Sequence, residues 1–161
     1  MINDAAVFIR DEVRNYLRRV DAVGMAEEVL LGNVALQEPG NPLSNKVLMT
    51  LVNLEEESAL KNSKGWSRDS LTGGIKVASP PVHLNLYFLF TATLSEPGSE
   101  PSDQAYQNAL SRIAAIVEFF QSKKVLTLQN SPAFDPNGRN LNERILNEIR
   151  LVPELYTLTF E

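Results

Sequence analysis

Residues 82–94, VHLNLYFLFTATL, decide the fold of this chain, because every even position among them is apolar. Successive side chains of a strand point to opposite faces, so the pattern predicts one long strand whose even face lies on the core. The odd face carries a histidine, an asparagine, a tyrosine and threonines, and is only partly polar. Pro80 and Pro81 precede the strand, and Pro97 and Gly98 follow it, so the element is sharply bounded.

The residues before this strand predict a helix and two further strands. Residues 3–20 have the spacing of an amphipathic helix, and residues 29–36 indicate a short strand that a Gly-Asn pair interrupts. Residues 46–57 are apolar on both faces until Asn53, which is typical of a central strand in a sheet covered on each side. The predicted inward positions of the helix are Ala6, Ile9, Val13, Leu17 and Val20.

A long excursion, residues 61–79, separates the central strand from the long one. It is rich in glycine, serine and charge and carries the only tryptophan, Trp66. Gly73 and Gly74 can close a hairpin within it, with Ile75 on the returning arm. Long loops are uncommon in compact domains unless functional or disordered, and tryptophan is enriched in interface hot spots. We therefore predict a partner-contact arm; the alternative is that Trp66 folds back onto its own domain.

The residues after the long strand predict two more helices and a closing strand. The first helix begins near Ser102 or Asp103, at the end of the SEPGSEPSD run. The second covers residues 141–149, and residues 156–160 alternate as a strand. Residues 125–130 have the character of a short extended piece. The apolar stripe of the first of these helices consists of Tyr106, Leu110, Ile113, Val117 and Phe120, widened by Ala109, Ile116 and Phe119.

These elements together predict an α+β fold, with a single mixed or mainly antiparallel sheet flanked by two or three helices. No internal repeat or composition shift marks a second domain, so one domain is expected over residues 1–161. The long strand and the helix after it carry the two largest apolar surfaces, and each needs the other for burial. The predicted core contact joins Leu84, Leu86, Phe88 and Phe90 with Ile113, Val117 and Phe120.

Composition argues against several kinds of site and partner. The chain contains no cysteine, which removes thiol nucleophiles, thiolate metal sites and disulfides. Its formal net charge is −5 and it has no block of basic residues, so we expect no nucleic-acid partner. Arg18 and Arg19 lie near a helix end, where they complement the macrodipole. Without a signal-like or bilayer-spanning apolar run, the protein is expected to be soluble and made in the cytoplasm.

Few residues are candidates for catalysis. His83 is the only histidine, so a Ser-His-Asp arrangement or a metal site would have to be built around it, and no nucleophile motif accompanies it. Glu55, Glu56 and Glu57 can be imagined as an acid/base pair or as ligands. Consecutive strand residues face opposite ways, however, so a strand end leaving the sheet explains them better.

Other polar motifs give no stronger signal. Asp135, Asn137 and Gly138 resemble part of a calcium loop, but Pro136 breaks the geometry and a turn is the better interpretation. The Gly-Gly pair is no phosphate loop, because no GK[ST] follows it. The sequence identifies no catalytic, cofactor-binding or metal-ligating residue, and we expect no enzymatic activity and no cofactor. Three asparagines in predicted strands are interpreted as bulge or hydrogen-bonding positions, namely Asn33, Asn53 and Asn85.

A family resemblance covers most of the chain. It is carried by MINDAAVFIRDEVRNYL (1–17), NKVLMTLVNLEEESALKN (45–62), SPPVHLNLYFLF (79–90) and YQNALSRIAAIVEFFQSKKVLTLQNSP (106–132). The most specific motifs are VNLEEE at 52–57, PPVHLNLYFLF at 80–90 and FFQ…NSP at 119–132. The chain resembles the N-terminal domain of the tube-terminating cap proteins of extracellular contractile injection systems. These phage-tail-like particles comprise an inner tube, a contractile sheath and a baseplate.

The resemblance implies a structural protein with a tail-terminator-like fold. It implies a homo-oligomeric ring with sixfold symmetry, that is, a hexamer. The ring sits on the baseplate-distal end of tube and sheath and fixes their length. The implied partners are further copies of the chain, the inner-tube protein and the sheath protein, without a membrane-spanning part. The implied location is a particle that is assembled in the cytoplasm and can be released from the cell.

Two other functions and one question of length stay open at this stage. One alternative is an adaptor module that docks cargo or a partner protein onto the assembly, and a third is a hydrolase that uses His83. Family members commonly continue past the strand that matches LYTLTFE, whereas this sequence stops at Glu161. One expectation is therefore that the sequence is a fragment that lacks C-terminal elements.

Overall fold

The computed structural model divides the chain into two compact units. Unit 1 comprises Met1–Thr50 and Phe90–Glu161, and unit 2 comprises Leu51–Leu89. Unit 1 holds both long helices, and unit 2 holds a separate two-stranded ribbon. The structure describes residues 1–20, 29–33, 46–57, 66–68, 74–77, 83–93, 103–132, 134 and 147–156.

Helix α1 covers Ile2–Val20, close to the predicted bounds. Its two last-turn arginines complement the helix macrodipole. Ile9, Val13 and Leu17 are buried as predicted, but Val20 is 54% exposed. Phe8 and Glu12, which the prediction leaves out, are 1% and 5% exposed. The prediction counted apolar residues alone, and therefore passed over an acidic residue that an ion pair holds inside.

The main sheet has the strand order β1-β2-β5. These strands cover Val29–Leu31, Val47–Glu56 and Leu84–Ala92, and β1 runs parallel to β2. The Glu57 N–H donates to the His83 carbonyl at 3.0 Å, and the Thr93 N–H donates to the Lys46 carbonyl at 2.9 Å. Residue numbers rise in one strand as they fall in the other, so β5 is antiparallel to β2. The sheet is therefore mixed, with β2 in the centre, as predicted.

Burial changes sharply along β2. Val47, Leu48 and Met49 are each at most 2% exposed. Because successive strand residues face opposite sides, three consecutive buried residues mean that both faces are covered there. The residues from Leu51 to Glu56 are all exposed. The prediction of a strand covered on both faces as far as Asn53 is thus wrong beyond Thr50, because a run of apolar residues does not reveal where its cover ends.

Unit 2 contains a hairpin of the predicted kind. Strand β3, Trp66–Arg68, pairs antiparallel with β4, Ile75–Val77, in a two-stranded sheet of its own. Trp66 lies opposite Val77 and Ser67 lies opposite Lys76. The excursion between the two long strands is therefore structured as a ribbon in this part. Whether it is a partner-contact arm stays a prediction.

Helix α2 covers Asp103–Ser122 and begins where the sequence predicted. The residues predicted to widen the apolar stripe, Ala109, Ile116 and Phe119, are buried, whereas Tyr106 and Leu110 of the stripe itself are 57% and 51% exposed. The apolar residues of α2 extend over more than one face, and one residue turns a helix by about 100°, so spacing alone left neighbouring orientations open. The buried residues of the helix are Ala109, Arg112, Ile116 and Phe119.

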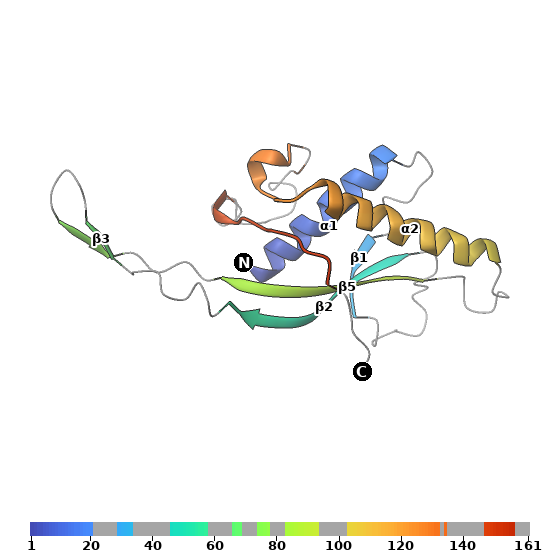
Figure 1. The fold of residues 1–161 in the computed structure, drawn as a ribbon, viewed down its shortest axis with the longest axis horizontal. Coiled ribbons are helices and arrows are strands. Elements are labelled where there is room, and N and C mark those ends of the chain that lie inside the picture. The colour runs from blue at the N-terminus through green and yellow to red at the C-terminus, as the bar shows by residue number, and fades with distance from the viewer. Residues whose placement is uncertain are drawn as a thin grey trace. The chain divides into compact units, whose positions relative to one another are not determined.

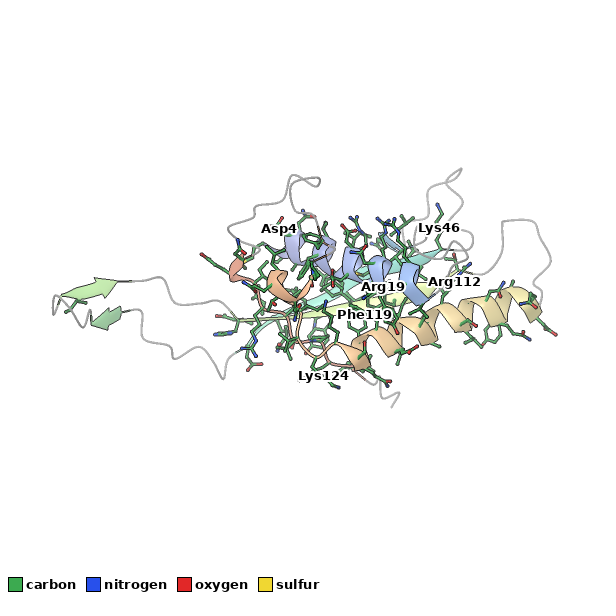
Figure 2. All side chains as sticks on the ribbon, turned by 90° about the horizontal axis from the view of Figure 1, so that it is seen from above. Asp4, Arg19, Lys46, Arg112, Phe119 and Lys124 are labelled. Atoms are coloured by element: carbon green, nitrogen blue, oxygen red, sulfur yellow. The ribbon has the colours of Figure 1, made fainter. Side chains whose placement is uncertain are left out.

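The two helices pack on each other in unit 1 and lie on the same side of its strands (Figure 1). Phe119 lies between the helices, with its ring 5.4 Å from that of Tyr16 (Figure 2). Burial raises the pKa of Tyr16, and the negative charge of Glu118 raises it further. The rings of Phe90 and Phe120 are 5.6 Å apart, which confirms this pair of the predicted strand-helix contact.

The chain after α2 returns along unit 1 through a short 3-10 helix, Leu128–Asn130. Leu126 and Leu151 form an isolated antiparallel bridge, so the extended piece predicted at 125–130 is extended only at its start. The helix predicted over 141–149, the calcium-like turn at 135–138 and the closing strand over 156–160 fall almost entirely outside the described residues.

Candidate functional site

The residues considered for catalysis lie at one end of the β2–β5 pair, in unit 2. His83 precedes β5, and its backbone carbonyl accepts the Glu57 N–H. The Glu55 carboxylate accepts hydrogen bonds from the Tyr87 hydroxyl at 3.1 Å and from the Asn53 amide at 2.8 Å. In the part of the chain that the structure describes, no three histidine or acidic side chains gather as a metal site would require.

These contacts form a polar ladder on one face of the strand pair. Asn85 donates to the Glu57 carboxylate at 3.0 Å, one step along from the bond between Tyr87 and Glu55. Asn53 also accepts the N–H of the next residue at 2.9 Å. Asn53 and Asn85 are therefore hydrogen-bonding positions, which confirms one of the two interpretations of these asparagines. The ladder joins β2 to β5 through side-chain hydrogen bonds, and the carboxylates of Glu55 and Glu57 are the acceptors.

The same strand pair exposes large apolar side chains, and this surface is the candidate functional site. Scattered single apolar residues are normal on a protein surface, but several on one short strand pair point to an interaction surface. The exposed residues are Leu51 at 41%, Val52 at 56%, Leu54 at 45% and Leu89 at 42%. Val52 and Leu54 lie on one face of β2 and Leu51 lies on the other, so the strand pair is exposed on both faces. We call these four residues together the strand surface. The signal for it in the sequence is the apolar character of both faces of the strand, which is also the pattern of a buried strand.

A second exposed surface lies in unit 1, beside the end of α2. An open pocket of about 400 Å³ lies between the helix end and the segment after Leu151. Lys124, just beyond the helix, contributes to it (Figure 2). The exposed fractions of Val152, Leu155 and Tyr156 are 59%, 55% and 74%. Sequence reasoning missed this surface, because the short proline-containing segment shows no periodicity. The pocket is lined by Phe120, Gln121, Lys124, Val152, Pro153, Glu154 and Leu155.

The family-like motif FFQ…NSP has a structural role in unit 1. The Lys123 ammonium contacts the Glu12 carboxylate at 2.5 Å, the Ser131 hydroxyl at 3.0 Å and the Asn130 carbonyl at 3.1 Å. Glu12 and Ser131 are 5% and 2% exposed. The lysine therefore joins α1 to the turn after α2 through charge-assisted hydrogen bonds. Thr127 adds a capping box, because its N–H is accepted by the Asn130 side chain at 3.0 Å.

No helix among the residues that the structure describes is both long enough and apolar enough to cross a membrane.

The comparisons with known proteins agree with the resemblance seen in the motifs. No curated protein matches the chain. A family model described as the Pvc16 N-terminal domain matches residues 5–161, nearly the whole sequence. This family is associated with phage-tail-like contractile injection systems. The chain therefore belongs to the Pvc16 N-terminal domain family.

Proposed function

We propose that this domain is the structural cap of a contractile injection system, where it terminates tube and sheath. In this proposal it forms a homo-oligomeric ring, a hexamer, at the baseplate-distal end of the particle. It binds further copies of itself and the inner-tube and sheath proteins. The particle is assembled in the cytoplasm before its release, and the domain itself carries no catalytic activity.

The observation that carries the proposal is the presence of two separate exposed apolar surfaces in a member of this family. A ring is held by heterologous contacts, which require two different patches on every subunit. The strand surface belongs to unit 2, and the surface around Val152 and Leu155 belongs to unit 1. A subunit that must contact its neighbours and the end of a tube needs more than one such patch.

The proposal is tested by deleting the gene and measuring particle length. A terminator limits tube growth, so particles without it should have a broad length distribution by electron microscopy, and some should lack closed ends. Expression of the wild-type protein in trans should restore one length. Particles of unchanged and uniform length in the deletion strain would refute a role as terminator.

An adaptor that docks cargo or a partner protein is the second candidate function. The open pocket beside α2 supports it, because concave sites with apolar walls and a few polar groups suit ligand or peptide binding. The same deletion separates the two functions. Loss of an adaptor should leave particle length unchanged and remove a cargo protein from purified particles, which mass spectrometry detects.

The proposed absence of catalysis has its own test. The double variant His83→Gln, Glu56→Gln removes the only histidine and one exposed carboxylate. Particle assembly and any injection activity should be unchanged, because these groups serve as strand residues. Loss of a hydrolytic or metal-dependent activity in the folded variant would refute a purely structural role.

A further inference from the structure

The outward face of helix α2 carries a repeat that is typical of helices that pair side by side. Its apolar residues are spaced alternately by four and three positions, which is the spacing of a coiled-coil seam. This seam differs from the face that packs in unit 1, which consists of Ala109, Arg112, Ile116 and Phe119. The helix therefore has a second apolar face in addition to its buried one. We call this second face the α2 stripe, and it consists of Tyr106, Leu110, Ile113, Val117 and Phe120.

The α2 stripe is most exposed in the N-terminal half of the helix. Tyr106 and Leu110 are 57% and 51% exposed. The other three residues of the stripe are partly exposed, and the Phe120 ring lies 5.6 Å from that of Phe90, so β5 covers part of that end. Two large apolar side chains that are half exposed on adjacent turns of one helix form a patch rather than scattered single residues. Ala114 beside them is small and exposed, which leaves room for a second helix to approach closely.

Opposite charges lie at the two ends of the α2 stripe. Asp103 is the first residue of α2 and Lys124 comes just after its last turn, and both are exposed. Both continue the seven-residue spacing of Leu110 and Val117. Gln121 lies on the same side of the helix as Leu110, because eleven residues correspond to about three turns, and it lines the open pocket together with Lys124. The stripe thus has an anionic end, an apolar middle, and a cationic end beside a pocket.

We propose that α2 pairs antiparallel with α2 of a second copy of this chain, about a two-fold axis at the middle of the helix. Leu110 of each copy then lies beside Val117 of the other, and Tyr106 reaches the pocket of the other. Asp103 of each copy lies near Lys124 of the other, so opposite charges meet at both ends. A parallel pair would instead place each of these charges next to its own counterpart, and such like-charge contacts disfavour that orientation.

The occupant of the stripe is a second copy because the stripe is complementary to itself. When one copy is turned about the two-fold axis, its anionic end meets a cationic end and its apolar middle meets an apolar middle. A contact of this kind uses the same patch on both subunits and closes after two copies. It does not continue around a ring, so the inference goes beyond the ring proposed above. We expect the pairing in the free protein, and its test needs no particle.

Cross-linking at single cysteines tests the pairing, because the chain contains no native cysteine. The full-length variant Ala114→Cys brings the thiols of two copies together at the axis, so a short bismaleimide should produce a covalent dimer. The matched control is Asn108→Cys, which is also exposed but lies almost opposite Leu110 on the helix, and it should give none. A head-to-tail contact brings different residues together, so Ala114→Cys distinguishes the two-fold pair from a ring contact.

The affinity of the pair provides a second reading. Leu110→Ala should raise the dissociation constant of the dimer at least about tenfold by analytical ultracentrifugation, because each dimer loses this side chain twice. Equal yields of covalent dimer from Ala114→Cys and Asn108→Cys, or none from either, would refute the pairing. A Leu110→Ala dimer that is as stable as the wild-type dimer would refute it as well.

Charge exchange tests the antiparallel orientation. Asp103→Lys or Lys124→Asp alone places like charges at both ends of the pair and should weaken the dimer. The double variant restores opposite charges and should recover the wild-type affinity, while circular dichroism checks that α2 is intact. Glu154 also lines the pocket. A double variant that binds no more tightly than the single variants would therefore show that Lys124 does not meet Asp103, and would refute the orientation.

Discussion

The ion pair of Glu12 and Lys123 connects two residues that are 111 positions apart in the sequence. The Glu12 side chain is 6% exposed and that of Lys123 is 23% exposed. A buried charge is tolerated only when a partner and further hydrogen bonds compensate for its lost hydration. Lys123 is the partner of Glu12, and its ammonium makes further hydrogen bonds to the Ser131 hydroxyl and the Asn130 carbonyl. Single polar residues thus stabilise the fold of unit 1. Lys123, Asn130 and Ser131 lie within the FFQ…NSP motif of the family resemblance.

Replacement of the lysine should therefore be costly. Lys123→Met leaves the Glu12 carboxylate buried without its cation, which costs about 3 kcal/mol of unfolding free energy. That value is the lower end of the usual range, because Lys123 is partly exposed. The exposed neighbour provides the control, since Lys124→Met should change stability by less than about 0.5 kcal/mol. Urea titration measures both, and equal midpoints for the two variants would contradict a structural role for the pair.

Helix α2 shows at the scale of an element how one helix can carry two apolar faces. Ile116 and Phe119 face inward at 3% and 1% exposure, whereas Tyr106 and Leu110 are more than half exposed. The outward face does not contribute to folding by burial. Its apolar residues are available for contacts with other proteins, which fits a subunit of an assembly.

The two faces of α2 predict opposite results for similar truncations. Ile116→Ala should lower the unfolding free energy by about 2–5 kcal/mol, because it leaves a cavity in the core. Leu110→Ala should stay within about 0.5 kcal/mol of wild type. Thermal melts of the isolated variants distinguish these outcomes. A larger loss for Leu110→Ala than for Ile116→Ala would show that Leu110, and not Ile116, lies in the core.

Strand β2 allows the same comparison within one element. Leu48 is 2% exposed in unit 1 and Leu54 is 45% exposed in unit 2. Leu48→Ala should cost about 2–5 kcal/mol, and Leu54→Ala should cost less than about 1 kcal/mol of stability. Light scattering should show weaker self-association for Leu54→Ala. Normal association of that variant, with reduced stability, would show that Leu54 serves the fold.

The two units of the molecule differ in how much of their apolar surface is buried. Unit 1 holds every residue that is under 2% exposed, among the residues that the structure describes, while β2 and the ribbon of unit 2 display exposed apolar side chains. A chain with this division keeps a core for stability in one part and offers surface for association in the other. Assembly into a larger particle gives the exposed part its partners.

The ribbon of unit 2 gives a prediction at this scale. Trp66→Ala should leave the melting temperature of the domain nearly unchanged, because the ribbon forms a sheet apart from the β1-β2-β5 sheet. It should weaken ring or tube association, since tryptophan is frequent in interface hot spots. Calorimetry and analytical ultracentrifugation provide the two readings. A core-like loss of stability with normal association would favour the alternative, in which Trp66 covers its own domain.

The sequence by itself determined the elements and the family of this protein. The first helix, the central and long strands and the second helix all lie where periodicity placed them, because alternation and helical spacing are local properties of the chain. The motifs also identified the family that the comparison confirms. Only the tertiary structure decided which apolar face is buried, where the cover of β2 ends and that Glu12 meets Lys123. Burial and pairing depend on neighbours that are distant in sequence, and an apolar residue has the same local pattern whether it meets its own core or a partner.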